Sequence, residues 1–522
     1  MSQWTASVGA AHLARLLGPR PRAGGSGTER GGGQENGDRR GHRNGGGAPK
    51  GAARRLPAYR ELADGVRLLV LEGRVQVAAR LPAERELALA LGVSRTTVAA
   101  AYEALRAEGF ARSRRGAGSW TAIPEGHVLP SRSLEPLPPD AAGSVIDLGT
   151  ASLPAPEPWL TRAMQGALAE LPAYAATHGD FPAGLPVLRE AIADRYTARG
   201  VPTMPEQIMV TTGAMGAIGG VARRVVGLGE RVAVESPSYA NVLELFRETG
   251  SRLVPVALRE GLGGWDMDAW RRVLRDAAPR MAYVMPDFHN PTGTLVGDDE
   301  RRELVEAARA AGTVVVADET MAELVLDGRE SGVRPMAAFD RGGTVMTVGS
   351  ASKAMWAGLR IGWVRTTPDV VRGLVSARAY LDLGSPVVDQ LAVAWLLRGG
   401  GWDQALAARR QRAAECRDDL AAALRERVPG WDFTVPRGGM TMWVRTGDVS
   451  GSRLAVAGER LGVRVPSGPR FSVDGAFESF IRIPFTVSGH TAVEAAARLS
   501  RAADLVRSGG ASDTEPAGLF VA

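Results

Sequence analysis

Lysine is rare in this chain, and one of its lysines has the setting of a reactive amine. Of the 63 Lys and Arg residues only two are lysines, Lys50 and Lys353. The bias is typical of a GC-rich genome, because lysine codons are A-rich. A lysine amine can lose its proton and form a Schiff base, whereas an arginine in a protein stays protonated. Lys353 is therefore either a solvated side chain that survived the bias or an amine required for chemistry, and its neighbours favour the second interpretation.

Strands and helices are predicted to alternate between residues 146 and 505. This alternation indicates an α/β domain with a largely parallel sheet. In such sheets ligands bind outside the carboxyl ends of the strands. The strands are predicted at residues 207–211, 231–235, 281–285, 313–317 and 344–348.

A residue suited to bind a ligand follows each of these strands. The segment Thr211-Thr-Gly-Ala-Met-Gly-Ala-Ile218 opens a helix whose free N–H groups can hold a phosphate, although a glycine-rich helix start is often only structural. Aromatic or polar side chains follow the other four strands. Separate structural accidents would have to coincide to place all of these groups at one sheet edge, so the pattern predicts a ligand site. The four residues are Tyr239, Asn290, Asp318 and Lys353.

Positive charge is concentrated in the first quarter of the chain. Residues 1–122 carry twenty basic and ten acidic groups, whereas the remaining 400 residues carry 43 and 47. This asymmetry predicts a polyanion partner for the N-terminal part. Residues 19–55 are rich in Gly and Arg and have almost no large apolar residue, so we predict disorder there. A solubilising tail is the alternative explanation of their charge, and a short helix is predicted at 11–18.

Residues 57–120 have the spacing of a winged helix-turn-helix. Pro82 can open a helix, Gly92 can end it, and Ser94 can cap the next helix. That next helix would enter the major groove of DNA by its N-terminal end, and a short basic hairpin follows it. A small helical protein-interaction domain is the alternative. The candidate DNA-contacting residues are Arg85, Ser94, Arg95, Thr96 and Thr97 on the helices and Arg112, Arg114 and Arg115 on the hairpin.

This region resembles the DNA-binding domain of the GntR regulators, and the resemblance implies double-stranded DNA as a partner. The matching phrases are Leu-Pro-Ala-Glu-Arg-Glu-Leu from Leu81, Leu-Gly-Val-Ser-Arg-Thr-Thr-Val from Leu91 and Leu-Arg-Ala-Glu-Gly-Phe from Leu105.

Residues 146–507 resemble the fold-type I aminotransferases, which use pyridoxal 5′-phosphate. The resemblance implies a mostly parallel large sheet, a smaller C-terminal α+β subdomain, and a homodimer with the active site at the subunit interface. It is carried by Thr211-Thr-Gly-Ala214, Pro237-Ser-Tyr239, His289-Asn-Pro-Thr-Gly293, Asp318 and Ser350-Ala-Ser-Lys353.

The resemblance also implies a role for each residue of the site. Lys353 would form the Schiff base with the cofactor, and Asp318 would keep the pyridinium nitrogen protonated. Asn290 would hydrogen-bond the phenolic oxygen, and Tyr239 would stack on the ring. The phosphate would be held by the Gly213 and Ala214 amides, Ser350 and Arg360.

Two further positions bear on the reaction. Arg482 resembles the arginine that grips a substrate α-carboxylate, and a surface arginine on a strand is the alternative. Many family members have a tyrosine two residues after the ring-nitrogen aspartate, where it touches the phenolic oxygen. Here Thr320 holds that place, with a shorter reach and a less acidic hydroxyl. The departure leaves cofactor binding intact and argues against efficient transamination.

A GntR-type domain joined by a linker to an aminotransferase-like domain is the layout of the MocR-type regulators. We therefore expect a DNA-binding transcriptional regulator that responds to pyridoxal 5′-phosphate or to an amino acid. A working aminotransferase with a DNA-binding appendage is the alternative. An architectural DNA-binding protein with an inactive pocket is a third hypothesis.

The expected organisation follows from these assignments. We predict a mostly disordered extension at 1–55, the winged helix-turn-helix at 56–122, a linker at 123–145, the aminotransferase-like domain at 146–507 and a disordered tail at 508–522. The single cysteine, Cys416, excludes an internal disulfide and fits a cytoplasmic protein. No membrane span, secretory signal or metal site is predicted.

Overall fold

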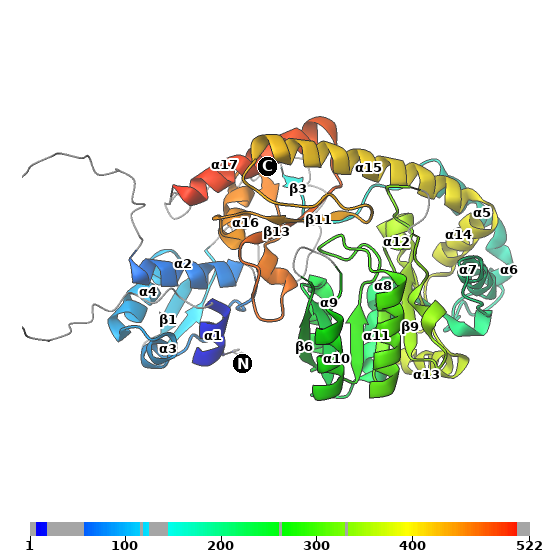
Figure 1. Ribbon diagram of the computed structural model, residues 1–522, viewed down its shortest axis with the longest axis horizontal. Coiled ribbons are helices and arrows are strands. Elements are labelled where there is room, and N and C mark those ends of the chain that lie inside the picture. The colour runs from blue at the N-terminus through cyan, green and yellow to red at the C-terminus, as the bar shows by residue number, and fades with distance from the viewer. Residues whose placement is uncertain are drawn as a thin grey trace, which may run out of the picture. The chain divides into compact units, whose positions relative to one another are not determined.

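The chain divides into two structural units in a computed structural model (Figure 1). The structure describes residues 7–17, 57–71, 73–114, 118–124, 145–259, 264–328 and 332–508. The boundary between the units falls between Pro130 and Ser131. The Gly/Arg-rich stretch at 19–55, most of the predicted linker and nearly all of the predicted tail lie outside the described residues. Within the described ranges, no helix is both long and apolar enough to cross a bilayer.

The described part of the N-terminal unit contains four helices and a hairpin. Apolar residues three and four apart on each helix meet in one core, where Leu62, Val66, Val98 and Leu105 are almost fully buried. The elements are α1 (Ala10–Leu17), α2 (Ala58–Leu71), α3 (Glu84–Leu91), α4 (Arg95–Ala107), β1 (Ala111–Arg114) and β2 (Gly118–Thr121), and the two strands pair antiparallel.

The turn between α3 and α4 has the structure that the sequence predicts. Gly92 adopts a left-handed conformation (φ +64°), and its N–H donates to the last carbonyls of α3. The Ser94 hydroxyl accepts a hydrogen bond of 3.1 Å from the N–H of Thr97 and caps α4. The predicted helix-turn-helix is therefore present.

Helix α1 confirms the short helix predicted near the N-terminus and shows where it lies. It packs on α2 and α3, and its Leu13 is fully buried in the core of the unit. The preceding residues extend the hairpin, because Ser7 forms a parallel bridge with Arg80 and Arg80 pairs with Trp120. Residues 7–17 thus belong to the N-terminal unit as an added layer.

The second unit is built on a seven-stranded sheet in the order β4-β10-β9-β8-β7-β5-β6. Only β10 runs antiparallel to its neighbours in this sheet, so the sheet is mostly parallel, as predicted. All five predicted strands are present within two residues of their expected ends. The strands are β4 (Ile208–Thr212), β5 (Arg231–Ser236), β6 (Arg252–Ala257), β7 (Met281–Val284), β8 (Val314–Asp318), β9 (Val345–Ser350) and β10 (Ile361–Arg365).

Helices cover both faces of this sheet (Figure 1). The alternation along β7 illustrates the two layers, since Met281 and Tyr283 join one core cluster and Ala282 and Val284 join another. One face packs against α8 (Gly213–Val225), α9 (Ala240–Glu248) and α13 (Pro368–Arg378). The other packs against α7 (Pro186–Ala198), α10 (Met267–Asp276), α11 (Asp298–Ala311) and α14 (Val387–Arg398).

A smaller α+β part completes the unit, as predicted. Helix α15 (Gly401–Arg427) is long and runs from the helices beside the large sheet to this smaller part (Figure 1). The remaining elements are α5 (Trp159–Glu170), α6 (Pro172–Ala175), α12 (Ala351–Ala354), α16 (Gly451–Arg460), α17 (Gly489–Arg507), the antiparallel pair β11 (Thr441–Arg445) and β13 (Phe480–Pro484), and the parallel pair β3 (Ile146–Asp147) and β12 (Val463–Arg464).

Candidate cofactor site and DNA-binding surface

Lys353 lies just beyond the carboxyl end of β9, in the short helix α12. Its Nζ donates a hydrogen bond of 2.6 Å to the carbonyl oxygen of Ala151. Burial, followed by the positive charges of Arg482 and Arg409, lowers the pKa of Lys353 to about 8. A substantial fraction of the amine is therefore neutral, and nucleophilic, at mildly alkaline pH.

Asp318 ends β8, the neighbouring strand, and its carboxylate accepts hydrogen bonds from Tyr283 and from both the backbone and the side chain of Thr320. The hydroxyl of Tyr283 donates to Oδ2 at 2.7 Å, and the N–H of Thr320 donates to Oδ1 at 3.0 Å. Burial raises the pKa of Asp318, and the hydrogen bonds from Tyr283 and Thr320 and the charge of Lys353 oppose that rise. These bonds hold an acceptor in place at the carboxyl edge of the sheet.

The start of α8 and the segment around Arg360 form one corner of the site. Gly213 has a left-handed backbone (φ +70°), and a Cβ atom there would lie 2.7 Å from Nη2 of Arg360. A Cβ on Gly362 would lie 2.5 Å from the carbonyl carbon of Gly213 and 2.7 Å from the nitrogen of Ala214. The start of α8 and strand β10 can approach this closely only because Gly213 and Gly362 have no Cβ atom. Free helix N–H groups and a guanidinium therefore meet in a corner suited to a phosphate.

Ser350 lies at the same corner and caps α12. Its Oγ accepts from the N–H of Ser352 at 3.1 Å and donates to the carbonyl of Ile361 at 3.1 Å. The hydroxyl is therefore fixed between β9 and β10.

Asn290 and Tyr239 follow β7 and β5. Asn290 is buried, and its Oδ1 has no hydrogen-bond partner among the residues that the structure describes. Tyr239 precedes α9; burial raises the pKa of its phenol, and charge interactions link it to Arg482 and Asp318. An unpartnered buried amide is costly unless a ligand completes its hydrogen bonds.

Arg482 lies on β13 of the smaller part and is 1% exposed, so the alternative of a surface arginine is wrong. Its guanidinium donates to the carbonyl of Gly149 and lies 5.2 Å from the ring centre of Phe471. Burial lowers its pKa to about 10, which leaves it charged at neutral pH. Its Nε has no hydrogen-bond partner in the described part of the chain, so the buried cation retains a free donor for a carboxylate.

These groups fit pyridoxal 5′-phosphate. The site offers an amine with a lowered pKa, a fixed carboxylate, an unpartnered amide, an aromatic ring and an anion corner. Charge interactions tie Lys353 to Asp318, Arg360 and Arg482, so the sequence-predicted residues converge. The chemistry of the donor set matches an aldehyde, a pyridine nitrogen, a phenolic oxygen and a phosphate.

Sequence reasoning missed three contributors to this site. Arg409 of α15 donates to the carbonyls of Lys353, Pro154 and Leu153 at 2.8, 2.6 and 3.0 Å. The carbonyls of Gly149 and Ala151 bind Arg482 and Lys353, and Tyr283 binds Asp318. One arginine among many and a chain of backbone carbonyls carry no sequence signal. Tyr283 lies in a predicted strand and differs from its apolar neighbours only by its hydroxyl.

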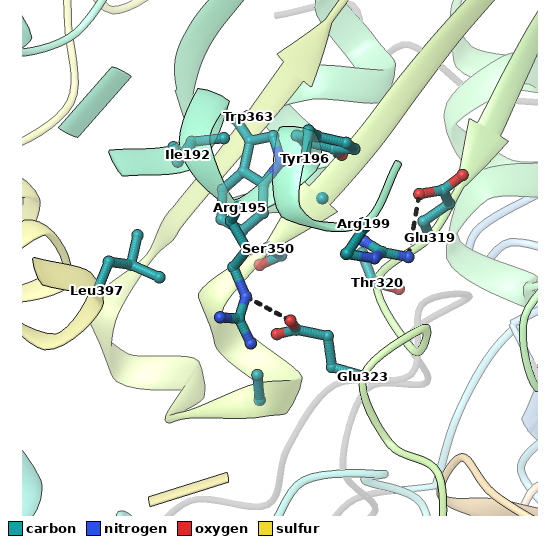
Figure 2. A pocket seen from close by; sticks show the side chains of 12 residues that line it. Ile192, Arg195, Tyr196, Arg199, Glu319, Thr320, Glu323, Ser350, Trp363 and Leu397 are labelled. Carbon is teal, nitrogen blue, oxygen red and sulfur yellow. Dashed lines mark hydrogen bonds and ion pairs between the residues drawn. The ribbon is translucent and has the colours of Figure 1, made fainter. Parts of the chain in front are cut away.

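A second pocket lies beside the cofactor site, and Lys353 is not in its wall (Figure 2). Thr320 and Ser350 belong to this wall, together with two ion pairs, Arg195 with Glu323 and Arg199 with Glu319. Thr320 thus lines this pocket and also binds Asp318, through its N–H and through its side chain. The full lining is Ile192, Arg195, Tyr196, Arg199, Glu319, Thr320, Glu323, Gly349, Ser350, Ala354, Trp363 and Leu397.

Glu319 is the acid in that wall whose pKa is shifted. Its Oε1 accepts from the N–H of Met336 at 2.9 Å, whereas its buried Oε2 lies 3.8 Å from Nη2 of Arg199 and has no hydrogen bond from a described residue. Burial raises the pKa of Glu319 to about 6, and the charge of Arg199 opposes the rise.

The N-terminal end of α4 forms the candidate DNA-binding surface of the other unit. The Ser94 hydroxyl is 2.7 Å from that of Thr96 and 2.8 Å from that of Thr97, and the Arg95 Nε donates to Glu84 at 3.0 Å. Arg85 and Arg112 are exposed. Arg114 ends β1, but its side chain and all of Arg115 lie outside the described residues.

Comparisons with known proteins agree with this two-unit organisation. Residues 153–499 match the family model of class I and II aminotransferases, which is more than half of the chain. The chain belongs to the class I and II aminotransferase family. Residues 58–120 match the model of bacterial regulatory proteins of the gntR family, so this family member also carries a GntR-type DNA-binding domain.

Two similar proteins are named as regulators. The chain is 26% identical over 477 residues to the uncharacterized HTH-type transcriptional regulator YisV of Bacillus subtilis, covering 85% of this chain and 96% of YisV. It is 27% identical over 409 residues to the probable rhizopine catabolism regulatory protein MocR of Rhizobium meliloti, covering 72% and 79%. The resemblance to the MocR-type layout is confirmed.

Solved aminotransferases share the fold of the second unit. The α-aminoadipate aminotransferase LysN of Thermus thermophilus, solved with N-(5′-phosphopyridoxyl)-L-leucine, is 27% identical with a TM-score of 0.63, covering 70% of this chain and 94% of LysN. The prediction of a fold-type I aminotransferase domain is confirmed. Family and fold together support pyridoxal 5′-phosphate as the cofactor of this class I and II aminotransferase-family chain.

Proposed function

We propose that this protein is a MocR-type transcriptional regulator whose DNA binding responds to pyridoxal 5′-phosphate or to an amino acid bound at the cofactor. The observation that carries the proposal is one chain with both a capped helix-turn-helix and a convergent set of cofactor-binding groups. The regulator YisV matches over 85% of the chain and MocR over 72%. Such a protein acts where the DNA is, so we place it in the cytoplasm.

Each residue of the site has a distinct task in this proposal. Bound pyridoxal 5′-phosphate supplies an aldehyde and an electron-withdrawing ring. Lys353 would provide the amine that attaches to it, Asp318 would accept a hydrogen bond from the ring nitrogen and keep that nitrogen protonated, Asn290 would bind the phenolic oxygen and Tyr239 would pack on the ring. Thr320 supports the site through its N–H on Asp318. The phosphate is held by the Gly213 and Ala214 amides, Ser350 and Arg360.

Arg482 is the proposed receptor for an effector carboxylate. It is buried, charged at neutral pH and keeps a free Nε donor among the described residues. Its positive charge also acts on Lys353 and Tyr239. An amino acid with its carboxylate on Arg482 would bring its amine toward the Lys353 end of the site.

We further propose a homodimer that binds two DNA half-sites. The segment around Asp382 carries exposed apolar residues, since Tyr380, Leu381 and Leu383 are 91%, 50% and 54% exposed. Asp382 accepts a hydrogen bond of 2.9 Å from Thr212, next to the phosphate corner. A second copy that covers these residues would complete the site, and two-fold symmetry would suit a palindromic operator.

On the DNA side, α4 would enter the major groove with Ser94, Arg95, Thr96 and Thr97, with Arg85 beside it. Arg112, Arg114 and Arg115 would reach the DNA backbone or the minor groove from the hairpin. The exposure of Arg85, Arg95 and Arg112 supports this arrangement. Arg95 would exchange its contact with Glu84 for DNA.

An active aminotransferase is the second candidate function. The lowered pKa of Lys353 and the buried cation of Arg482 favour it. Thr320 opposes it, because a threonine stands where many family members have a tyrosine, and its hydroxyl has a shorter reach and is less acidic. Sustained conversion of an amino acid and a 2-oxo acid would support this candidate, whereas a single half-reaction would oppose it.

A gel-shift titration with the DNA upstream of the gene, with and without saturating pyridoxal 5′-phosphate, tests the main proposal. We expect sequence-selective binding that changes with the cofactor. Sequence-selective binding that is unchanged by the cofactor, with or without an added amino acid, would contradict the proposal that either ligand controls DNA binding. If the protein shows no sequence-selective DNA binding, an active aminotransferase remains as the candidate function.

A further inference from the structure

The geometry points to Tyr283 as a positioning residue that fixes the Asp318 carboxylate and favours its charged form opposite the cofactor ring nitrogen. This inference rests on the proposed cofactor site. It adds a residue that lies behind Asp318 and would not touch the cofactor.

The contact is direct and well enclosed. Tyr283 lies on β7, next to β8, and is fully buried. Its ring meets Phe246 edge-on, with ring centres 5.7 Å apart, and its hydroxyl donates to Oδ2 of Asp318 at 2.7 Å. The packed ring therefore fixes the donor, and the Thr320 N–H fixes the other oxygen at 3.0 Å. These donors bind separate oxygens and, with a further hydrogen bond from the Thr320 side chain, set the plane of the carboxylate.

The charge environment explains why this donor matters. Burial raises the pKa of Asp318, which favours a neutral acid that cannot stabilise a ring-nitrogen proton. A hydrogen bond donated to the carboxylate opposes that effect. Burial and the charge of Asp318 keep the phenol of Tyr283 protonated, with its pKa well above the usual value, so it remains a donor throughout the working range.

The groups that face this pair come from several strands. Lys353, Glu235 and Tyr239 act electrostatically on Asp318 or Tyr283. Lys353 stabilises the Asp318 anion, whereas Glu235 and Tyr239 act on the tyrosine. Without the Tyr283 hydroxyl, Asp318 becomes a stronger base and competes with the ring nitrogen for their shared proton. The ring then withdraws fewer electrons, and the nitrogen of Lys353 attached to the cofactor keeps its own proton to a higher pH.

The experiment follows the visible absorbance of the cofactor-loaded full chain as a function of pH. We expect Tyr283→Phe to raise the midpoint of the spectral transition by about one pH unit. The lost hydrogen bond makes Asp318 more basic by about 1–2 pH units, and only part of this change reaches the nitrogen of Lys353 through the ring. Tyr196→Phe is the matched control: Tyr196 is buried in the same unit, but its hydroxyl is bonded by Trp363 at 3.2 Å. We expect that control to leave the midpoint unchanged.

A double-mutant cycle separates positioning from general damage. In an Asp318→Asn background, Tyr283→Phe should produce no further shift of the midpoint, because the carboxylate that the Tyr283 hydroxyl stabilises is absent. Three results would each overturn the inference: a Tyr283→Phe midpoint equal to that of the unmodified chain, an equal shift in Tyr196→Phe, or a Tyr283→Phe shift that persists in the Asp318→Asn background.

A second measurement covers the case in which Tyr283→Phe does not fold. Replacement of all tyrosines by 3-fluorotyrosine keeps the ring and makes each phenol a stronger donor, so the midpoint should fall, and it should not fall in Asp318→Asn. An unchanged midpoint would contradict the role of Tyr283. If the unmodified chain shows no visible absorbance with the cofactor, the cofactor site itself is wrong, which is a distinct result.

Discussion

The Nζ of Lys353 donates a 2.6 Å hydrogen bond to the carbonyl oxygen of Ala151, which lies 202 residues earlier in the chain. The neighbouring carbonyl of Gly149 accepts from Arg482. One short segment after β3 therefore holds both the amine proposed to bind the cofactor and the guanidinium proposed to bind an effector. Attachment of the Lys353 amine to a ligand would release the Ala151 carbonyl, whereas Arg482 could bind a carboxylate through its free Nε and keep its bond to Gly149.

The rate of cofactor uptake should rise with pH. Burial and neighbouring arginines lower the pKa of Lys353 from 10.5 to about 8, and only the neutral amine attacks an aldehyde. We expect the uptake rate, followed by visible absorbance after mixing, to reach half its maximum near pH 8. Lys353→Ala should give no covalent attachment. A half-maximal rate above pH 10 would show that the amine is not perturbed.

Replacement of Arg482 should weaken the binding of amino-acid carboxylates and leave cofactor binding unchanged. We expect Arg482→Gln to reduce affinity for amino acids about 10- to 100-fold, since a hydrogen bond to a charged group contributes about 1.5–3 kcal/mol. Changes in the spectrum of the loaded protein on adding amino acids would report the affinity. The exposed Arg223 of α8 supplies the control Arg223→Gln, which should bind normally. Equal affinities in Arg482→Gln and the unmodified chain would refute the role of Arg482.

Glu319 should make the second unit less stable as pH rises. Its pKa is raised from 4.5 to about 6, so between these values the folded chain holds more protons than the unfolded chain. Unfolding free energy therefore falls as pH increases through this window. Glu319→Gln, which cannot ionise, should gain on the order of 1–2 kcal/mol relative to the unmodified chain between pH 4 and pH 7.

Urea unfolding at a series of pH values would measure this difference. The exposed Glu306 provides the control, because Glu306→Gln removes an acid that is not buried. A difference between Glu319→Gln and the unmodified chain that stays constant with pH would contradict the assignment.

Helix α1 should contribute to the stability of the DNA-binding unit. Leu13 is fully buried between α2 and α3, and truncation of a buried leucine typically costs about 2–5 kcal/mol. We expect Leu13→Ala to lower the unfolding temperature of that unit in calorimetry of the full chain. Leu89→Ala is the control, because Leu89 is 86% exposed on α3. Equal unfolding temperatures in the two variants would mean that α1 does not hold the unit together.

The parts of the structure that depend on local sequence patterns could be predicted from the sequence. Strand positions followed from apolar runs, and the Gly92–Ser94 turn followed from a left-handed glycine and a capping hydroxyl. The convergence of Asp318 and Lys353 followed from the geometry of parallel strands, which brings successive carboxyl ends together.

The remaining features depend on long-range packing. The contact of Arg409 with Lys353 requires the path of α15, and the contact of Tyr283 with Asp318 requires the register of β7 on β8. The burial of Leu13 requires the docking of a helix that precedes a long Gly/Arg-rich stretch. The wall position of Thr320 likewise depends on how the chain turns after β8, which a residue count from Asp318 does not specify.

DNA binding by the unmodified chain and by Lys353→Ala, each with and without pyridoxal 5′-phosphate, tests the central claim most directly. Fluorescence anisotropy with the DNA upstream of the gene would give both affinities under one salt condition, which matters because phosphate contacts are salt-dependent. We predict that the cofactor changes the affinity of the unmodified chain and leaves that of Lys353→Ala nearly unchanged. An equal cofactor effect in both proteins would contradict the claim that attachment at Lys353 controls DNA binding.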